Sequence, residues 1–352
     1  MKVLVTGSSG VLGHTMVPQL VEAGHEIRLF DLLPPPSSLE QRIRATGKEA
    51  KIEVVTGDMR DAAALRDATA GIEVVQHLAA GQRMKPQFAG LSEQEIFDMN
   101  LGGVENVLAA ARECAVRRVV FISSSAVYGV PETPLVDEED HPKAPLGAYG
   151  ESKLQAEALC LRALDQGLDV AMLRPMSLFG DGMTGVFVLL FDWVRRNRRV
   201  FMLGSGNNRV QMVGAEDVSR CALLAAESPD ARGLIVNVGS APETVPSVRA
   251  QCEALIRYAG KDSKFTGIPA ILLRNAARVL NLVGMSPIVP EHYKLADADF
   301  VLDISRARRI LGWEPAGDNI SITCDAYDWY CRNWEQVAPK PNLPLRILEA
   351  VT

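Results

Sequence analysis

The sequence predicts an α/β fold in which a doubly wound parallel sheet is joined to a smaller C-terminal α/β lobe. Three observations support this expectation. A short apolar run, Lys2–Thr6, leads into a glycine-rich turn and then into an apolar, helix-like stretch at residues 11–23. Strand-like and helix-like patterns go on alternating, which is typical of a parallel sheet covered by helices on both faces. The chain has 352 residues, 47% of them hydrophobic and 23% charged, enough for one large or two modest domains.

The elements of the sheet are expected to follow one another at short intervals. Each expected strand is a short apolar run, and each expected helix has apolar residues at helical spacing. After the first strand and helix, strands are expected at 25–30, 52–56, 72–77 and 117–123, helices at 61–70 and 95–113, and a surface loop at 34–38. We expect residues 1–172 to form the Rossmann domain and residues 173–352 to form mainly the substrate lobe, with segments near 210–240 returning to the first domain.

The turn after the first strand carries three glycines, Gly7, Gly10 and Gly13, at a spacing of three. Glycines permit the tight turn, let the backbone approach a pyrophosphate and let the helix pack closely on the strand, while the N–H groups at the helix start face the phosphates. The second strand leads to Asp31, where a carboxylate can accept hydrogen bonds from both hydroxyls of a ribose and would repel a 2′-phosphate. The ordinary alternative is a glycine-rich hairpin turn followed by a surface aspartate. Because strand, turn, helix and acid agree, we expect a dinucleotide site that favours NAD over NADP.

Tyr149 and Lys153 stand four residues apart, downstream of a serine cluster at 123–125. Such a pair on its own is a weak signal, since many helices carry an aromatic residue and a solvated cation at this spacing. Its position after the glycine turn and the serine cluster favours a phenol that transfers protons. An unperturbed tyrosine has a pKa of about 10, and an ammonium a few ångströms away favours the phenolate. The serines have an ordinary alternative role, which is to satisfy the last backbone groups of a strand.

Charge and composition argue against several classes of protein. The net charge of -6 argues against a nucleic-acid surface, and the basic run at 195–199 is expected to be a solvated helix end, where cations complement the helix dipole. The six cysteines lack the spacing of metal ligands, so we expect reduced thiols, a cytoplasmic protein and no metal site. No signal-peptide pattern and no apolar run long enough to span a bilayer occurs, so no membrane partner is expected.

A series of short motifs in a fixed order extends these observations along most of the chain. They are 6–13 (TGSSGVLG), 57–58 (GD), 77–80 (HLAA), Asn100 with 103–108 (GVENVL), 123–129 (SSSAVYG), 149–153 (YGESK), 174–175 (RP), 216–218 (EDV), 237–239 (NVG) and 307–315 (ARRILGWEP). On these motifs the chain resembles an extended short-chain dehydrogenase/reductase of the NAD-dependent epimerase/dehydratase family, with similarity running from Met1 to about Pro315.

The resemblance implies roles for individual residues. Tyr149 would be the acid/base that takes a proton from a substrate hydroxyl, Lys153 would hydrogen-bond the nicotinamide ribose, and Ser124 would hydrogen-bond the same substrate oxygen, with Ser123 and Ser125 as rivals. The cofactor NAD would be bound by Gly7, Ser9, Gly10, Val11, Leu12, Gly13, Asp31, Asp58, Met59, Leu78, Ala79, Ala80, Asn100, Ser123, Tyr149, Lys153, Pro175 and Met176. The substrate would be contacted by Ser125, Ser177 and Arg209. The resemblance also implies a homodimer, formed through 95–113 and 149–163.

The resemblance narrows the reaction as well. Members that eliminate water or carbon dioxide carry acidic residues between the catalytic serine and the Val-Tyr-Gly motif, whereas this chain has Ser125 and Ala126 there. We therefore expect an NAD-dependent epimerase of a nucleoside-diphosphate sugar, in which the sugar is transiently oxidised at C4. Ser177 stands where sugar-nucleotide members usually have an asparagine that contacts the diphosphate, which weakens this expectation. Arg209 supports it, because a guanidinium can engage phosphate oxygens in pairs.

Two alternatives stay open. The apolar segment 268–289 resembles the C-terminal region of relatives that act on hydrophobic ketones, which favours a dehydrogenase or reductase of a sterol-like or flavonoid-like compound. Its ordinary role would be a core or dimer helix. The second alternative is a non-catalytic protein that senses the dinucleotide. The intact Tyr149, Lys153 and Ser124 argue against a sensor, which has no need of a phenol beside an ammonium.

Overall fold

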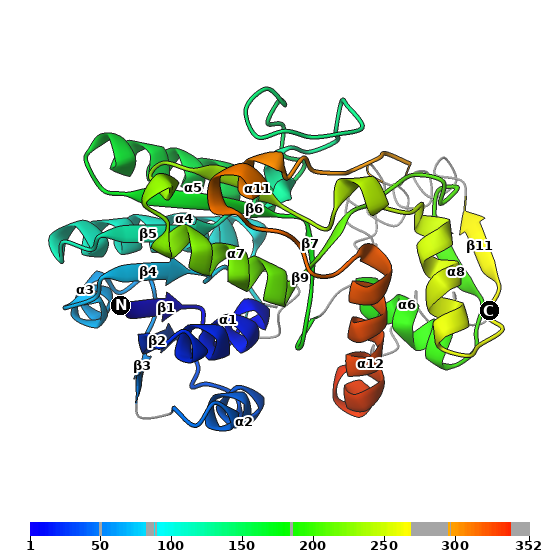
Figure 1. The fold of residues 1–352 in the computed structure, drawn as a ribbon, viewed down its shortest axis with the longest axis horizontal. Coiled ribbons are helices and arrows are strands. Elements are labelled where there is room, and N and C mark those ends of the chain that lie inside the picture. The colour runs from blue at the N-terminus through cyan, green and yellow to red at the C-terminus, as the bar shows by residue number, and fades with distance from the viewer. Residues whose placement is uncertain are drawn as a thin grey trace.

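A computed structural model describes residues 1–48, 51–81, 88, 90–183, 186–268, 295 and 297–338. Its centre is a seven-stranded sheet in the order β10-β6-β5-β4-β1-β2-β3 (Figure 1). Every pair of neighbouring strands in this sheet runs parallel. The strands are β1 (Lys2–Thr6), β2 (Glu26–Asp31), β3 (Ile52–Thr56), β4 (Val74–His77), β5 (Arg118–Ile122), β6 (Val170–Pro175) and β10 (Ile235–Val238).

Helices cover both faces of this sheet. One face carries α3 (Ala62–Thr69), α4 (Glu93–Glu113) and α5 (Ala148–Asp165), and the other carries α1 (Val11–Glu22), α2 (Ser37–Ala45), α7 (Ala215–Glu227) and α11 (Ser305–Leu311). Successive side chains of a strand point to opposite faces. Accordingly, Val3 and Val5 belong to the core beneath α1, and Leu4 belongs to the core beneath α4. The predicted doubly wound parallel sheet is thus confirmed.

The observed elements begin and end within two residues of the expected ones, except near residue 37. The expected loop at 34–38 continues into α2, which buries Leu39 and Ile43 against the core shared with α1. Only these two apolar side chains, one turn apart, mark the helix, so its sequence pattern is weak. The helix expected at 95–113 begins earlier, at Glu93, because the Ser92 side chain caps it in a capping box with Glu95.

The remaining elements form a smaller lobe at one end of the molecule, on the right in Figure 1. They are β7 (Ser177–Phe179), α6 (Val186–Arg195), β8 (Val200–Leu203), β9 (Met212–Gly214), α8 (Val248–Tyr258), β11 (Phe265–Ile268) and α12 (Asn319–Val337). Strands β8 and β11 form one parallel pair, and β7 and β9 form another. Aromatic side chains fill the core of this lobe, where Phe191 contacts Phe179, Tyr327 and Tyr330.

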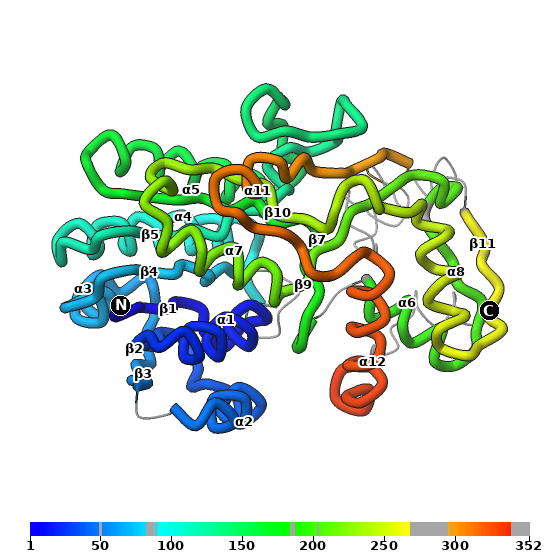
Figure 2. The backbone as a smooth tube through the Cα atoms, in the orientation of Figure 1, coloured from blue at the N-terminus to red at the C-terminus, as the bar shows by residue number. Residues whose placement is uncertain are grey.

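The chain passes between the two parts more than once. After β9 it returns to the large sheet, where α7 packs on α1 and β10 pairs with β6 (Figure 2). Strand β6 spans residue 172, which is the expected boundary between the two domains. The division of the chain into domains 1–172 and 173–352 stays a prediction.

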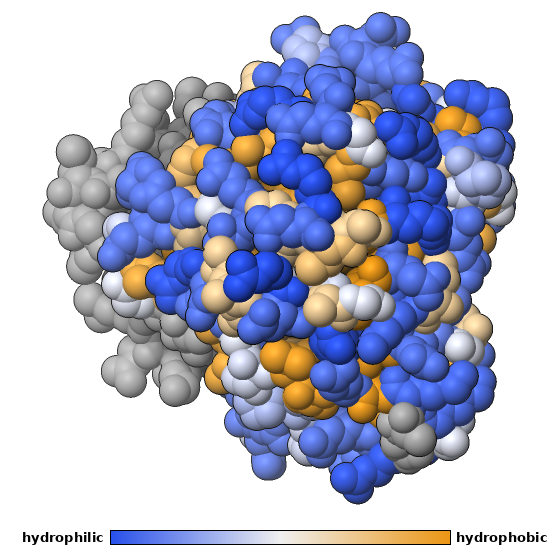
Figure 3. Space-filling view, turned by 90° about the vertical axis from the view of Figure 1, so that its left-hand side faces the viewer, coloured by the Kyte–Doolittle hydropathy of each residue, from blue (hydrophilic) through white to orange (hydrophobic). Residues whose placement is uncertain are grey.

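The strands of the large sheet run toward the smaller lobe (Figure 1). Viewed from the opposite end, where the strands begin, the surface is mainly hydrophilic, with apolar side chains in small separate patches (Figure 3). In parallel sheets ligands bind at the carboxyl ends of the strands. The architecture therefore points to the side of the sheet that faces the lobe. Within the described ranges, no helix is long and apolar enough to cross a bilayer.

Candidate active site

The turn between β1 and α1 is closed in the way that a glycine-rich phosphate loop requires. Gly7 has a φ of +74°, and a Cβ there would lie 2.6 Å from backbone atoms of Ala79, in the turn after β4. A Cβ on Gly13 would lie 1.8 Å from the carbonyl oxygen of Ser8, so only glycine lets α1 approach the turn. Gly10 is the N-cap of α1 and supplies no side-chain acceptor to the N–H groups of its first turn. These groups, with Val11 and Leu12 opening the helix, make the kind of helix start that suits an anion.

Asp31 lies directly beside this turn. Its Oδ2 accepts a hydrogen bond from the backbone N–H of Ser9 at 2.9 Å, which joins the end of β2 to the glycine turn. The carboxylate is only partly buried, so it keeps capacity for further donors. This geometry fits an acid that receives ribose hydroxyls next to the pyrophosphate position. The turn residues and Asp31 together fit the adenosine half of NAD.

The residues after β3 and β4 lie at the same edge of the sheet as the glycine turn. Asp58 is paired with Arg60, whose guanidinium lies 2.5 Å from Oδ2 and, by hydrogen bonding, lowers the pKa of the Asp58 carboxyl. Met59 packs on α4 at Gly103, where a Cβ would lie 2.8 Å from its terminal carbon. Leu78 donates its N–H to the carbonyl of Thr6 at 3.1 Å and leads into the Ala79-Ala80 turn.

Asn100 acts on that turn from α4. Its Oδ1 accepts from the N–H of Gly81 at 2.6 Å, and its Nδ2 donates to the carbonyl of Gly81 at 3.1 Å. Both ends of the buried amide therefore hold the backbone of the turn. Any effect of Asn100 on the cofactor is transmitted through the position of residues 79–81.

Tyr149 and Lys153 lie in the first two turns of α5, beside the end of β5. Lys153 is buried, and its Nζ donates to the carbonyl oxygen of Ile122 at 2.8 Å. The same Nζ lies 6.0 Å from the centroid of the Tyr149 ring and 4.8 Å from that of Phe121. The start of α5 is pressed against the segment after β5, since a Cβ on Gly150 would lie 2.7 Å from the carbonyl oxygen of Ala126. Phenol, ammonium and serine cluster are thus brought to one place.

The three serines differ in what their hydroxyls do. Ser123 is buried and donates to Oε1 of Glu157 at 2.6 Å. Ser124 caps the short helix η3 (Ser125–Val127) and accepts from the N–H of Ala126 at 3.1 Å, which leaves its own hydrogen for another acceptor. Ser125 is buried, with 7% of its surface exposed. This arrangement favours Ser124 over Ser123 as the donor to a substrate oxygen.

Of the residues at and after the end of β6, Pro175 and Met176 were expected to contact the cofactor, and Ser177 and Arg209 were expected to contact the substrate. Pro175 ends β6 at the carboxyl end of the sheet, and Met176 follows it, buried and donating its N–H to Val238. Ser177 begins β7, whose partner β9 follows Arg209 along the chain. The Arg209 guanidinium is 41% exposed and lies 3.0 Å from Oδ2 of Asp299. Arg209 therefore already has an acidic partner, which the sequence pattern did not indicate.

A buried polar network behind the serines was not expected. It joins Glu157, Arg174, Tyr128, Asn237 and Glu138. Burial raises the pKa of Tyr128 to about 12 and also raises the pKa of Glu138. Burial alone would lower the pKa of Arg174, but the hydrogen bonds and charge of Glu157 raise it. The only sequence signal for Glu157 is that it lies four residues after Lys153, on the same side of a helix.

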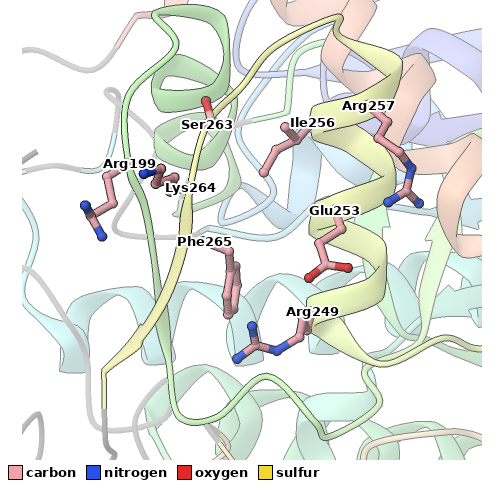
Figure 4. A pocket seen from close by; sticks show the side chains of 8 residues that line it. All are labelled: Arg199, Arg249, Glu253, Ile256, Arg257, Ser263, Lys264 and Phe265. Carbon is pink, nitrogen blue, oxygen red and sulfur yellow. The ribbon is translucent and has the colours of Figure 1, made fainter.

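A cavity of about 450 Å³ lies elsewhere, between α8 and β11. Arg249 and Glu253 reach from α8 toward Phe265, whereas Arg257 points away from the strand (Figure 4). The Arg249 guanidinium lies 4.4 Å from the centroid of the Phe265 ring. None of the predicted site residues lines this cavity, so we do not place the active site there. The basic run at 195–199 begins with the last residue of α6, and the guanidinium carbon of Arg195 lies 3.8 Å from the centroid of the Trp334 ring.

Comparisons with known proteins agree with the geometry. Residues 3–239 match the family model described as the NAD dependent epimerase/dehydratase family. An uncharacterized protein, y4nG, of Sinorhizobium fredii is 33% identical over 333 residues, which are 94% of this chain and 78% of that protein.

Two relatives with named activities are more distant in sequence. A 4-hydroxy-2-methyl-3-oxo-4-farnesyl-3,4-dihydroquinoline-1-oxide ketoreductase of Stigmatella aurantiaca is 28% identical, over 89% of this chain and 92% of the relative. A UDP-glucose 4-epimerase of Streptomyces lividans is also 28% identical, over 94% and 96%.

The fold has close counterparts among solved structures. The UDP-glucose-4-epimerase of Stenotrophomonas maltophila, solved with bound NAD and formylated UDP-arabinopyranose, superposes with a TM-score of 0.78 and 23% identity, covering 95% of this chain and 99% of that one. The family match spans the glycine turn, the serine cluster and the Tyr149-Lys153 pair. The chain belongs to the NAD dependent epimerase/dehydratase family and is an NAD-dependent enzyme of the extended short-chain dehydrogenase/reductase type.

Proposed function

We propose that the protein epimerises a nucleoside-diphosphate sugar at C4. The observation that carries this proposal is the meeting of Tyr149, Lys153 and Ser124 at the end of β5, on the side of the sheet where the glycine turn also lies. Further support comes from the UDP-glucose 4-epimerase of Streptomyces lividans, which this chain matches over nearly its full length. When bound, NAD would supply a hydride acceptor and donor, so that the sugar could be oxidised and reduced with no net change in the cofactor.

The residues of the chain supply the proton chemistry. The Tyr149 phenolate takes the proton of the C4 hydroxyl, and the ammonium of Lys153 stabilises the phenolate by its charge. Ser124 donates to the same sugar oxygen, which orients it toward the phenol. When the sugar has turned its other face to the cofactor, Tyr149 returns the proton. Ser125 and Ala126 hold no acid that could assist elimination, so the reaction stops at epimerisation.

We assign to Arg209 the binding of the substrate diphosphate. Its Nε and Nη2 engage Asp299, and Nη1 is the remaining arm of the fork. A guanidinium held in this way by a carboxylate is oriented before the substrate arrives, which reduces the entropy lost on binding. A homodimer formed through α4 and α5, in the cytoplasm, is part of the same proposal.

The proposal is tested with Tyr149→Phe. The substitution removes only the phenolic oxygen, so conversion between UDP-glucose and UDP-galactose should slow by a factor of about 10² or more, the usual contribution of general acid–base catalysis. Tyr258→Phe is the matched control, because the Tyr258 side chain is exposed and hydrogen-bonds Asp328 on the lobe surface. Undiminished conversion in Tyr149→Phe would remove Tyr149 from the mechanism. Firm NAD binding with no turnover of any UDP-, dTDP- or GDP-sugar would favour the sensor instead.

A second candidate is a dehydrogenase or reductase of a hydrophobic alcohol or ketone. The serine at 177 and the similarity to a farnesyl-quinoline ketoreductase favour it. The apolar segment 268–289, which suggested this activity, lies outside the described residues except for Ile268. Net production of NADH from an added alcohol distinguishes the two functions. An epimerase regenerates NAD in every turnover, so it shows no such accumulation.

A further inference from the structure

Behind the serine cluster, Glu157 and Arg174 form an ion pair with almost no exposed surface. The Glu157 and Arg174 side chains are 3% and 1% exposed, and two parallel hydrogen bonds of 2.8 Å join them. The Arg174 guanidinium also donates to the Tyr128 hydroxyl at 2.8 Å and to the Glu138 carbonyl at 3.1 Å. Tyr128 in turn donates to Oδ1 of Asn237 on β10 at 2.7 Å.

The ion pair is linked to the proposed catalytic groups through the residues Ile122 and Ser123 at the end of β5. Lys153 and Glu157 lie one turn apart on α5 and contact successive residues at the end of β5. Lys153 holds the carbonyl of the peptide unit between Ile122 and Ser123, and Glu157 holds the side chain of Ser123, whose backbone N–H donates to the carbonyl oxygen of Leu173 on β6 at 2.8 Å. Lys153 donates to the carbonyl oxygen of Ile122 at 2.8 Å, and the hydroxyl of Ser123 donates to Glu157 at 2.6 Å. The same unit leads directly into Ser124. Its position therefore determines where the ammonium and the Ser124 hydroxyl lie.

Stability alone does not explain why such a pair is present. Removing two charges from water costs several kcal/mol, and an apolar pair of similar volume often stabilises a fold equally well. What an apolar pair cannot do is accept the Ser123 hydroxyl at a fixed point. Arg174 keeps the carboxylate in one orientation, because its planar fork matches both oxygens of Glu157.

We propose that Glu157 is a positioning residue, which sets the Ile122-Ser123 peptide unit and through it places Lys153 for the nicotinamide ribose. This inference rests on the role of Lys153 in the proposed function, but it is tested without any substrate. Glu157 itself touches neither cofactor nor sugar. Its effect is transmitted through the backbone at the end of β5.

The test compares Glu157→Gln with Asp169→Asn in the full chain. Asp169 also belongs to a largely buried ion pair, with Arg118 at 2.6 Å, but this pair lies at the opposite ends of β5 and β6, away from the serines. Both substitutions remove one charge from a buried pair and should lower the Tm. Only Glu157→Gln should also raise the Kd for NAD, by about tenfold, as expected when one charge-assisted hydrogen bond is weakened. Titration calorimetry with NAD measures this difference.

A third variant separates position from charge. Glu157→Asp keeps the carboxylate but is one methylene shorter, so it should lose contact with Ser123 and share the tenfold rise in the Kd. It also serves if Glu157→Gln fails to fold. An unchanged Kd in Glu157→Asp, or an equal rise in Asp169→Asn and Glu157→Gln, would overturn the positioning role. Neither result depends on which sugar, if any, is turned over.

Discussion

His77 is a fully buried imidazole at the end of β4, close to the proposed active site. Its Nδ1 lies 2.6 Å from the Thr6 hydroxyl, and its ring stacks on Phe121. Burial, assisted by the positive charge of Lys153, lowers its pKa from 6.5 to about 3. The imidazole is therefore neutral in the native protein at neutral pH. No metal ligand role is needed to explain it.

This burial predicts a pH dependence of stability. The native pKa lies below the unfolded one, so below pH 6.5 the unfolded chain takes up a proton that the folded protein excludes. The free energy of unfolding should then fall by about 2 kcal/mol between pH 7 and pH 5 on account of this group. In His77→Asn the fall should be smaller by that amount, as measured by urea unfolding at several pH values. His25, whose pKa is also lowered, is present in both proteins, so its contribution to the pH dependence of stability is the same in each. Parallel curves for the two proteins would contradict the assignment.

The residues at the candidate site differed in how well they could be predicted from the sequence. Gly7 and Gly13 could be predicted as close-packed turn residues, because the backbone geometry there allows few residue types, whereas the cofactor role of Asp31 stays a prediction. Glu157 could not, because its function depends on Arg174 and Ser123, which are distant in sequence and meet only when β5, β6 and α5 pack. The partner of Arg209 was missed for the same reason, since Asp299 is 90 positions away.

At the scale of elements, the contact between α1 and the turn after β1 is the most constrained one. Gly13→Ala would place a Cβ 1.8 Å from the Ser8 carbonyl oxygen, so the turn must shift. We expect a loss of about 1–3 kcal/mol in the free energy of unfolding, as for other overpacked sites, together with weaker NAD binding. Gly102→Ala is the control, since a Cβ there meets nothing within 4 Å and α4 should gain up to about 1 kcal/mol from helix propensity. Both effects are measured by denaturant unfolding, and equal stabilities of the two variants would contradict the close packing of α1.

The elements that were predicted most accurately were those with an unambiguous sequence pattern. Strands β1 and β3 were expected at their observed bounds because most of their residues are apolar or β-branched and a turn follows each of them. Helix α2 was missed because only one turn of it is apolar. The lobe elements were not assigned in advance, because short strands such as β7 and β9 are defined by their mutual pairing more than by their composition.

At the scale of the whole molecule, Asp217 at the start of α7 joins two distant parts of the chain. Its buried carboxylate accepts from the N–H groups of Ala316 at 3.0 and 3.1 Å and of Gly317 at 3.3 Å. It is also paired with Arg220, and its backbone carbonyl accepts from the Trp313 indole at 3.0 Å. One carboxylate thus holds the segment between α11 and α12 against the helix that covers the large sheet.

This arrangement predicts a large effect from a small change. Asp217→Asn replaces one acceptor oxygen by a donor that faces N–H groups, so we expect a loss of about 2–4 kcal/mol in the free energy of unfolding. Glu216→Gln, at the exposed neighbouring carboxylate, should change it by no more than about 0.5 kcal/mol. Chemical denaturation of both variants measures the difference. Similar small losses would show that Asp217 does not hold the two parts together.

The order of the strands has a consequence for synthesis on the ribosome. Strand β6 is complete at residue 175, but its outer neighbour, β10, begins only at residue 235. A nascent chain stopped between these points has an apolar strand with an open row of backbone donors and acceptors, the kind of edge that recruits foreign strands. Translation pauses within this interval should therefore raise the yield of insoluble product more than pauses after β10 has emerged.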